Sequence, residues 1–262
     1  MIIKQYIKDF ENLGFGMFVH FGLYSILGTG EWSKHSLNIA DEDYELLKEQ
    51  FEPKKDWATE LVKTAKNAGC KYITLTTRHH DGFSLYDTCG LNDYDAHHSK
   101  EDLNYKSPAQ MIRELADCRR YGANMLMNIG PTEDGSVREI DRAILNLMGK
   151  WVSYHDEALR RPRPTGIEIE GKPNDFILRY ENNYYLFCYN LPMSADFNVA
   201  LYTDVNYDSK FVLKDKICKA TWLDNGAEVS YVQEGEQVTV TTEPFTYGRN
   251  LVVRIAKLVC ED

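Results

Sequence analysis

The chain has 262 residues, of which 43% are hydrophobic and 12% aromatic, and its formal net charge is −10. The length suits one large α/β domain or two medium ones, and the apolar content excludes a disordered chain. The acidic balance argues against nucleic acid or an anionic membrane as a partner.

The N-terminal segment carries charges at Lys4, Lys8, Asp9 and Glu11, which interrupt the apolar stretch that a signal peptide needs. No part of the sequence approaches the ~20 apolar residues of a membrane span. The six cysteines lie far apart without a C-x-x-C pair, which argues against a zinc ribbon and is typical of reduced thiols. We therefore expect a soluble, cytoplasmic protein without a membrane partner.

The first part of the chain alternates predicted strands and helices. Residues 15–22 form a short apolar run punctuated by glycines, which predicts a buried strand. A helix is predicted from about residue 56 to Gly69, and it leads into a β-branched, apolar strand at 72–77. The expected buried face of this helix is Trp57, Leu61, Ala65 and Ala68.

The same order recurs after residue 106. Ser107 as N-cap and Pro108 at the first helical position predict a helix that ends near Gly122 and feeds a strand at 123–130. A third helix follows Ser136, with an expected buried face of Ile140, Ile144, Leu147 and Trp151. Repeated strand–helix units predict an α/β fold whose parallel strands are covered on both sides.

The segment 160–166 contains two prolines and marks a domain boundary. Beyond it come short alternating strands, with turn signals at Asn225-Gly226 and Glu234-Gly235. We therefore predict an α/β domain at residues 1–163 and an antiparallel β-sandwich at residues 164–262.

Polar side chains gather just past the predicted strand ends, where α/β proteins hold their ligands. His20 ends the first strand, and Glu31 and Trp32 follow in the next loop. His79 and His80 follow the second strand. Further strand-end candidates are Arg78, Asp81, Asn128, Gly130, Pro131, Thr132, Glu133 and Asp134.

Each of these residues also has an ordinary structural interpretation. His20 could be a satisfied core histidine, Trp32 could serve packing, and Asp81 and Asp134, each followed by glycine, could simply form turns. A metal site is disfavoured because the adjacent His79 and His80 point in opposite directions in extended chain. Imidazoles, a carboxylate and an indole suit a polyhydroxylated ligand better.

Three motifs, "FGMFVHFGLYS…GEW", "YITLTTRHHDGFSLYD" and "GANMLMNIGPTEDGSV", resemble the α-L-fucosidases of glycoside hydrolase family 29. The resemblance implies a (β/α) barrel of TIM type followed by a β-sandwich. It implies retaining hydrolysis of terminal α-L-fucosides on oligosaccharides or glycoconjugates, with an aspartate nucleophile and without metal or organic cofactor. It also places His20, Glu31, Trp32, His79 and His80 around the fucose.

The barrel region is short for such a fold. A (β/α)₈ barrel takes ~250 residues, whereas only about 160 precede the sandwich, which is room for about five βα units. The family motifs meet near residues 96–99, so the middle of the barrel, with the strand that bears the nucleophile, is predicted to be absent. The resemblance gives neither Asp93 nor Asp95 that role.

Three hypotheses therefore stay open: a working fucosidase, a fucose-binding pseudoenzyme without turnover, and a non-functional remnant. A missing half barrel would expose apolar strand edges, which predicts pairing with another copy of the chain.

Overall fold

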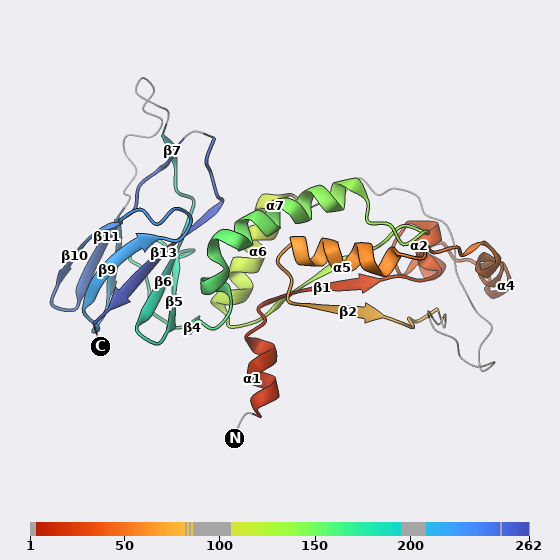
Figure 1. Cartoon of the computed structure of the whole chain (residues 1–262), viewed down its shortest axis with the longest axis horizontal. Helices are drawn as coiled ribbons and strands as arrows, with labels where there is room; N and C mark the ends of the chain where they lie inside the picture. Colours follow the sequence, from red (N-terminus) through yellow and green to blue (C-terminus); the bar gives the residue numbers. More distant parts are fainter. Residues whose placement is uncertain are drawn as a thin grey trace. The chain divides into compact units, whose positions relative to one another are not determined.

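A computed structural model describes residues 4–81, 83, 85, 106–194, 208–246 and 248–261. The chain forms two compact units, which are Met1–Gly14, Ala109–Met125 and Lys150–Asp262 in unit 1, and Phe15–Pro108 and Leu126–Gly149 in unit 2. Figure 1 shows the elements in chain order. The predicted junction at 96–99, Asp93, Asp95 and the strand expected near residue 200 lie outside the described residues.

A three-stranded sheet of order β2-β1-β3 organises the α/β part. Its strands are β1 (Phe15–His20), β2 (Tyr72–Thr76) and β3 (Met125–Ile129). The central strand β1 buries Phe15, Met17 and Val19 completely. β1 and β2 run parallel, with Gly16 beside Tyr72, and a Cβ at Gly16 would lie 2.3 Å from the Tyr72 ring. Glycine is required there because the aromatic ring fills the place of a side chain.

Strand β2 is exposed, although the sequence predicts a buried strand. Ile73 and Leu75 keep 38% and 37% of their surface exposed, and Leu126 on β3 is also exposed. Parallel strands are normally covered on both faces. Among the described residues, β2 and β3 are the outer strands of this sheet, so the sheet does not close into a barrel. It also has fewer strands than the length of the α/β region allows. The exposure of β2 follows from this outer position.

Helix α5 (Trp57–Asn67) buries Leu61 and Ala65, with Ala68 just beyond its end, as predicted. Helix α7 (Glu139–His155) follows its predicted face only in part. Trp151 is buried and Ile144 half-buried as predicted, but Ile140 and Leu147 are exposed, and Leu145, Met148 and Val152 are buried instead. The reason is a close approach at Gly149, where an added Cβ would lie 1.8 Å from the Asn67 carbonyl oxygen. The helix therefore buries the face that carries Gly149, and apolar spacing alone does not identify it.

Short helices connect β1 to α5. They are α2 (Tyr24–Leu27), α3 (Ser33–Ser36), α4 (Asp41–Glu45) and the 3₁₀ turn η1 (Leu46–Gln50). Leu23, Ile26, Tyr44 and Phe83 form a small core beneath them. This core fixes the loops that leave the carboxyl ends of β1 and β2.

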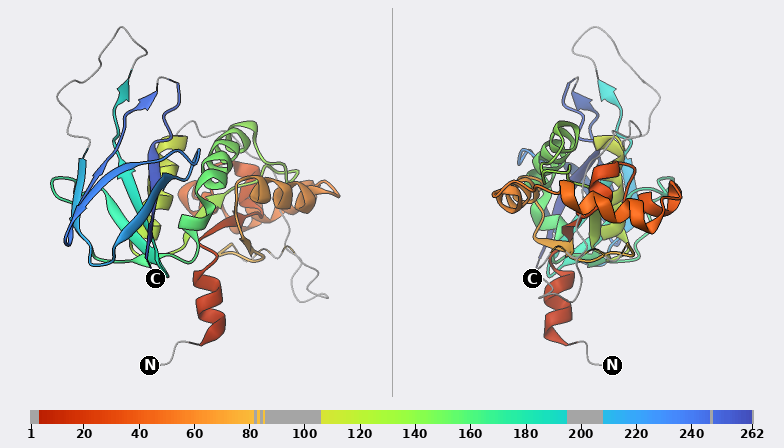
Figure 2. Two further views of the ribbon diagram at one scale, coloured as in Figure 1. Left: turned by 60° about the vertical axis from the view of Figure 1, so that its left-hand side comes forward. Right: turned by 90° about the vertical axis from the view of Figure 1, so that its right-hand side faces the viewer.

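Two antiparallel sheets dominate unit 1 (Figures 1 and 2). The larger has the order β4-β5-β6-β13-β9, with bounds Arg163–Pro164, Phe176–Tyr180, Asn183–Tyr189, Val253–Cys260 and Ile217–Trp222. The smaller has the order β10-β11-β8, with bounds Ser230–Glu234, Gln237–Thr241 and Asp208–Val212. One core joins them, with Leu186 and Trp222 from the first sheet and Phe211 and Val240 from the second. The predicted turns at Gly226 and Gly235 have φ values of 71° and 60°.

Unit 1 also holds smaller elements. They are α1 (Gln5–Glu11), α6 (Pro108–Arg120), the 3₁₀ turn η2 (Asp156–Leu159) and the paired strands β7 (Met193–Ser194) and β12 (Phe245–Thr246). Helix α6 buries Met111, Ile112 and Leu115. Over the described ranges, no helix has the length and apolar character needed to cross a membrane.

No disulfide joins any two of the described cysteines. They are Cys70, Cys118, Cys188, Cys218 and Cys260, while Cys89 lies outside the described residues. Burial raises the pKa of the Cys188 thiol well above its ordinary value, so this group stays protonated and unreactive.

Candidate functional site

The predicted histidines meet at the carboxyl ends of β1 and β2. His20 ends β1 and lies opposite Thr76, the last residue of β2. Because the strands are parallel, the chain that follows Thr76 begins beside His20. The His20 and His79 rings lie 5.3 Å apart, with their planes at 78°. The sheet register therefore joins two residues that are almost 60 positions apart in the sequence.

Trp32 and Glu31 approach the second histidine of the pair. The Trp32 indole stacks on the His80 ring, with centroids 4.0 Å apart and planes at 15°. His80 Nε2 lies 2.7 Å from the Glu31 carbonyl oxygen. A carbonyl only accepts, so this nitrogen carries the proton. Trp32 thus has a packing role, yet 54% of its surface is exposed, which leaves room for a further contact.

The half-buried His20 and His79 are neutral near pH 7. Burial lowers the pKa of His20, while Glu31 opposes the shift. Burial also lowers the pKa of His79, and His80 and His20 lower it further. Nδ1 of both His20 and His79 is buried without a hydrogen-bond partner in the part of the chain that the structure describes. Unpaired buried polar atoms are uncommon in folded proteins, and they concentrate at functional sites.

Asp81 shapes the loop that presents the histidine pair. Its buried carboxylate accepts from the Tyr44 hydroxyl at 3.0 Å and from the Phe83 backbone N–H at 3.2 Å. The turn interpretation of Asp81 is therefore correct, and this carboxylate is engaged by the protein. Burial raises the pKa of the neighbouring Tyr24 phenol, and Asp81 and Glu31 raise it further, so that hydroxyl stays protonated.

A cavity of about 240 Å³ opens at this end of the sheet. Among its walls are His20, Tyr24, Glu31, Asn128, Thr132 and Arg138. Of the five residues predicted to hold a ligand, His20 and Glu31 line the cavity, whereas Trp32, His79 and His80 form the ring cluster beside it. The strand-end residues Asn128, Gly130, Pro131 and Thr132 also line it, but Glu133 and Asp134 do not.

Sequence reasoning missed Tyr24 and Arg138. Tyr24 follows His20 within an apolar run that is typical of core, and it is indeed buried. Arg138 precedes helix α7 and pairs with Asp141 at 2.9 Å, the pattern of an ordinary helix-end ion pair. Their positions a few residues past a strand end were the only available signal.

Asp134 fixes the loop that follows β3. Its carboxylate accepts from Thr132 Oγ1 at 2.8 Å and from the Ser136 backbone N–H at 2.9 Å, and it pairs with Lys54 Nζ at 3.0 Å. Burial would raise the pKa of Asp134, but these bonds lower it well below its ordinary range. Its predicted turn role is confirmed, since Gly135 donates its N–H to the Thr132 carbonyl oxygen at 2.8 Å.

The geometry defines an α/β protein with attached antiparallel sheets and a polar cavity at the carboxyl ends of parallel strands. The sequence profile of the family described as alpha-L-fucosidase matches residues 3–103 and 89–157. These segments together cover more than half of the chain, and the chain belongs to the α-L-fucosidase family. They overlap at 89–103, the stretch that contains the predicted junction.

Known relatives match short stretches. The human tissue α-L-fucosidase is 37% identical over 62 residues, which is 24% of this chain and 13% of that protein. The α-L-fucosidase of Dictyostelium discoideum is 26% identical over 101 residues, which is 30% of this chain and 22% of that protein. The chain thus matches less than a quarter of the length of either relative.

Solved structures of fucosidases share the fold. A bacterial fucosidase with an iminocyclitol inhibitor has a TM-score of 0.80 at 15% identity, over 99% of this chain and 97% of that chain. The α-L-fucosidase isoenzyme 1 of Paenibacillus thiaminolyticus has a TM-score of 0.77 at 18% identity, over 98% and 99%. Both the α/β part and the antiparallel sheets therefore have counterparts in solved fucosidases.

Proposed function

We propose that the chain recognises a terminal α-L-fucosyl unit of an oligosaccharide or glycoconjugate and serves its retaining hydrolysis. The observation that carries this proposal is the meeting of the His20 and His79 rings, 5.3 Å apart, next to a cavity lined by Glu31. The family membership supports the choice of sugar. In this proposal the parallel sheet is part of a TIM-type barrel within residues 1–163, and residues 164–262 are the C-terminal sandwich.

Each site residue has a role that suits a sugar. The imidazoles of His20, His79 and His80 can form hydrogen bonds with hydroxyl groups. The Glu31 carboxylate is an acceptor for a hydroxyl proton. The exposed part of the Trp32 ring can cover the apolar face of a pyranose.

Turnover needs a carboxylate beyond this set. A retaining glycosidase uses one carboxylate as nucleophile, which forms a covalent glycosyl intermediate that water then hydrolyses with help from a second carboxylate. No described residue takes the nucleophile role by motif. The alternative function is fucose binding without turnover, and the overlap of the two family segments at 89–103 favours it, because the missing strand would fall there.

Two measurements on the wild-type chain separate these functions. The chain is incubated with a chromogenic aryl α-L-fucoside, and L-fucose is titrated separately by calorimetry. Release of the aglycone supports hydrolysis, and L-fucose binding without release supports the alternative. A folded chain that gives neither response refutes both.

Variants then test the residue assignments. His79→Ala and His80→Ala should each lower kcat/KM by about 10²-fold in an active chain, or weaken L-fucose binding measurably in an inactive one. Tyr6→Ala is the control, because Tyr6 is an exposed aromatic side chain that stands outside the proposed set. Equal behaviour of all three variants and the wild type would refute the assignments.

A further inference from the structure

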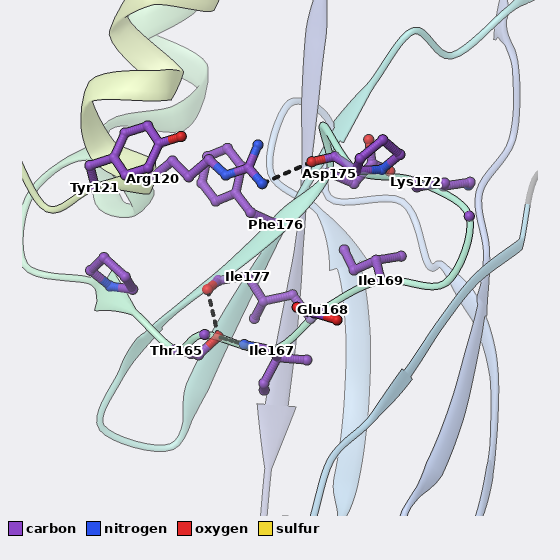
Figure 3. A pocket seen from close by; sticks show the side chains of 14 residues that line it. Arg120, Tyr121, Thr165, Ile167, Glu168, Ile169, Lys172, Asp175, Phe176 and Ile177 are labelled. Carbon is purple, nitrogen blue, oxygen red and sulfur yellow. Dashed lines mark hydrogen bonds between the residues drawn. The ribbon is translucent and has the colours of Figure 1, made fainter.

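A second and larger cavity lies within unit 1. It has a volume of about 600 Å³ and is formed by the C-terminal end of α6 and the segment 164–177 (Figure 3). Figure 3 shows Arg120 and Tyr121 reaching from the helix toward Phe176 and the segment that carries Lys172 and Asp175. This volume falls within the ~300–1,000 Å³ typical of small-molecule sites. None of these residues belongs to the α-L-fucoside site proposed above.

A buried carboxylate, that of Asp175, belongs to the residues that line this cavity. Asp175 has only 6% of its surface exposed. Its Oδ1 accepts from the Tyr189 backbone N–H at 2.9 Å, whereas its Oδ2 is buried and has no hydrogen-bond partner among the described residues. Burial raises the pKa of Asp175 to about 6, so the group is mostly ionised at pH 7 and able to accept. The fold thus holds an acceptor that it does not itself use.

Two aromatic rings and a guanidinium held by backbone carbonyls also line the cavity. Arg120 donates to the carbonyl oxygens of Pro173 and Asn174 at 2.8 and 3.4 Å. Its guanidinium carbon lies 5.6 Å from the Phe176 ring centroid and 6.0 Å from that of Tyr121. Tyr121 is 78% exposed, so its ring is free to cover a ligand at the mouth of the cavity. These contacts fix the wall before any ligand arrives.

The charges around the cavity cancel. Arg120 and Lys172 are balanced by Glu168 and Asp175. An anionic ligand would meet the two carboxylates, and a cationic ligand would meet the guanidinium and the ammonium. A neutral ligand with hydroxyl groups and an apolar face avoids both penalties. It can donate to Asp175 and lie against Tyr121.

We propose that this cavity is a second carbohydrate site, which binds a neutral sugar unit through Asp175 and the Tyr121 ring. The choice of carbohydrate among neutral ligands rests on the proposed function of the chain. A ligand of the second site need not contain fucose, so the second site can be tested independently of the first.

The test is a titration of the full chain with lactose, a neutral disaccharide without fucose, followed by saturation-transfer NMR and calorimetry. Glucuronate and glucosamine serve as the anionic and cationic probes. We expect lactose to bind with a higher affinity than either charged sugar. Absence of lactose binding, or a preference for a charged probe, would overturn the proposal.

Variants place the binding in this cavity. Tyr121→Ala should raise the Kd for lactose at least about fivefold, since it removes the covering ring. The matched control is Tyr6→Ala, which removes a similarly exposed tyrosine from α1 and should leave the Kd unchanged. Equal Kd values for Tyr121→Ala and Tyr6→Ala would overturn the proposal.

Asp175→Asn separates a ligand-binding role from a structural one. The asparagine oxygen can still accept from Tyr189, so thermal stability should not fall, while the lactose Kd should rise. An unchanged Kd for this variant refutes the role of Asp175.

His79→Ala distinguishes the two sites: it should weaken L-fucose binding and leave lactose binding intact. Loss of both in His79→Ala would assign lactose to the first site and overturn the second.

Discussion

His155 makes the stability of unit 1 depend on pH. Its imidazole is completely buried, and Nδ1 donates to the Trp151 carbonyl oxygen at 2.9 Å. Nε2 is buried and has no hydrogen-bond partner in the described part of the chain. Burial lowers the pKa of His155 to about 4, outweighing the opposing effects of the Trp151 carbonyl and Asp224. Protonation would place a cation inside the core.

The sign follows from the two pKa values. The folded pKa of about 4 lies below the unfolded value of 6.5, so the unfolded chain binds the proton more tightly. Stability from the neutral imidazole is fully present above pH 6.5 and is lost as the pH falls toward 4. The full loss is about 3 kcal/mol, and between pH 7.5 and pH 5 it is about 2 kcal/mol.

Urea unfolding of wild type and His155→Asn at pH 7.5 and pH 5 tests this magnitude. The asparagine amide can still donate to Trp151, and any loss from poorer packing is the same at both pH values. The pH-dependent drop in unfolding free energy should therefore be about 2 kcal/mol smaller in the variant than in the wild type. His35→Asn, at an exposed histidine, is the control and should behave as wild type. Identical drops in His155→Asn and wild type would refute the reasoning.

Further expectations concern unit 2. Gly149→Ala should lower the unfolding free energy by about 1–3 kcal/mol, because its Cβ meets the Asn67 backbone; an unchanged urea midpoint would contradict that contact. Tyr44→Phe should cost about 1 kcal/mol and weaken L-fucose binding, since Asp81 loses its hydroxyl donor; intact fucose affinity would show that this bond does not position the histidine pair. The exposed strand β2 predicts self-association, which Leu75→Lys should reduce in sedimentation velocity; a strictly monomeric wild type would count against it.

Local patterns predicted much of the fold because they act over a few residues. The spacing of Leu61, Ala65 and Ala68 identified the buried face of α5, and the glycines at 226 and 235 identified turns. The predicted face of α7 was wrong for Ile140 and Leu147 because apolar residues lie on more than one side of that helix. Only its packing partner selects the buried side, through the contact of Gly149 with Asn67.

In the candidate site, too, local patterns predicted some features and only the tertiary structure decided others. Strand-end positions singled out His20, Glu31, Trp32, His79 and His80, because parallel strands bring their carboxyl ends to one side of a sheet. The sequence did not show which of these five residues line the cavity and which form the ring cluster beside it. It also could not assign Asp81 to loop support, since a free carboxylate and a buried acceptor look the same in sequence.

The sequence by itself determined the strand–helix order, the change to antiparallel strands after residue 163 and the family. It also predicted a short barrel region, because chain length limits the number of strands. Only the tertiary structure decided that β2 is exposed, that His155 is buried with an unpaired nitrogen and that Asp175 faces a cavity. Burial and hydrogen-bond pairing depend on residues distant in the chain, and local sequence patterns do not contain that information.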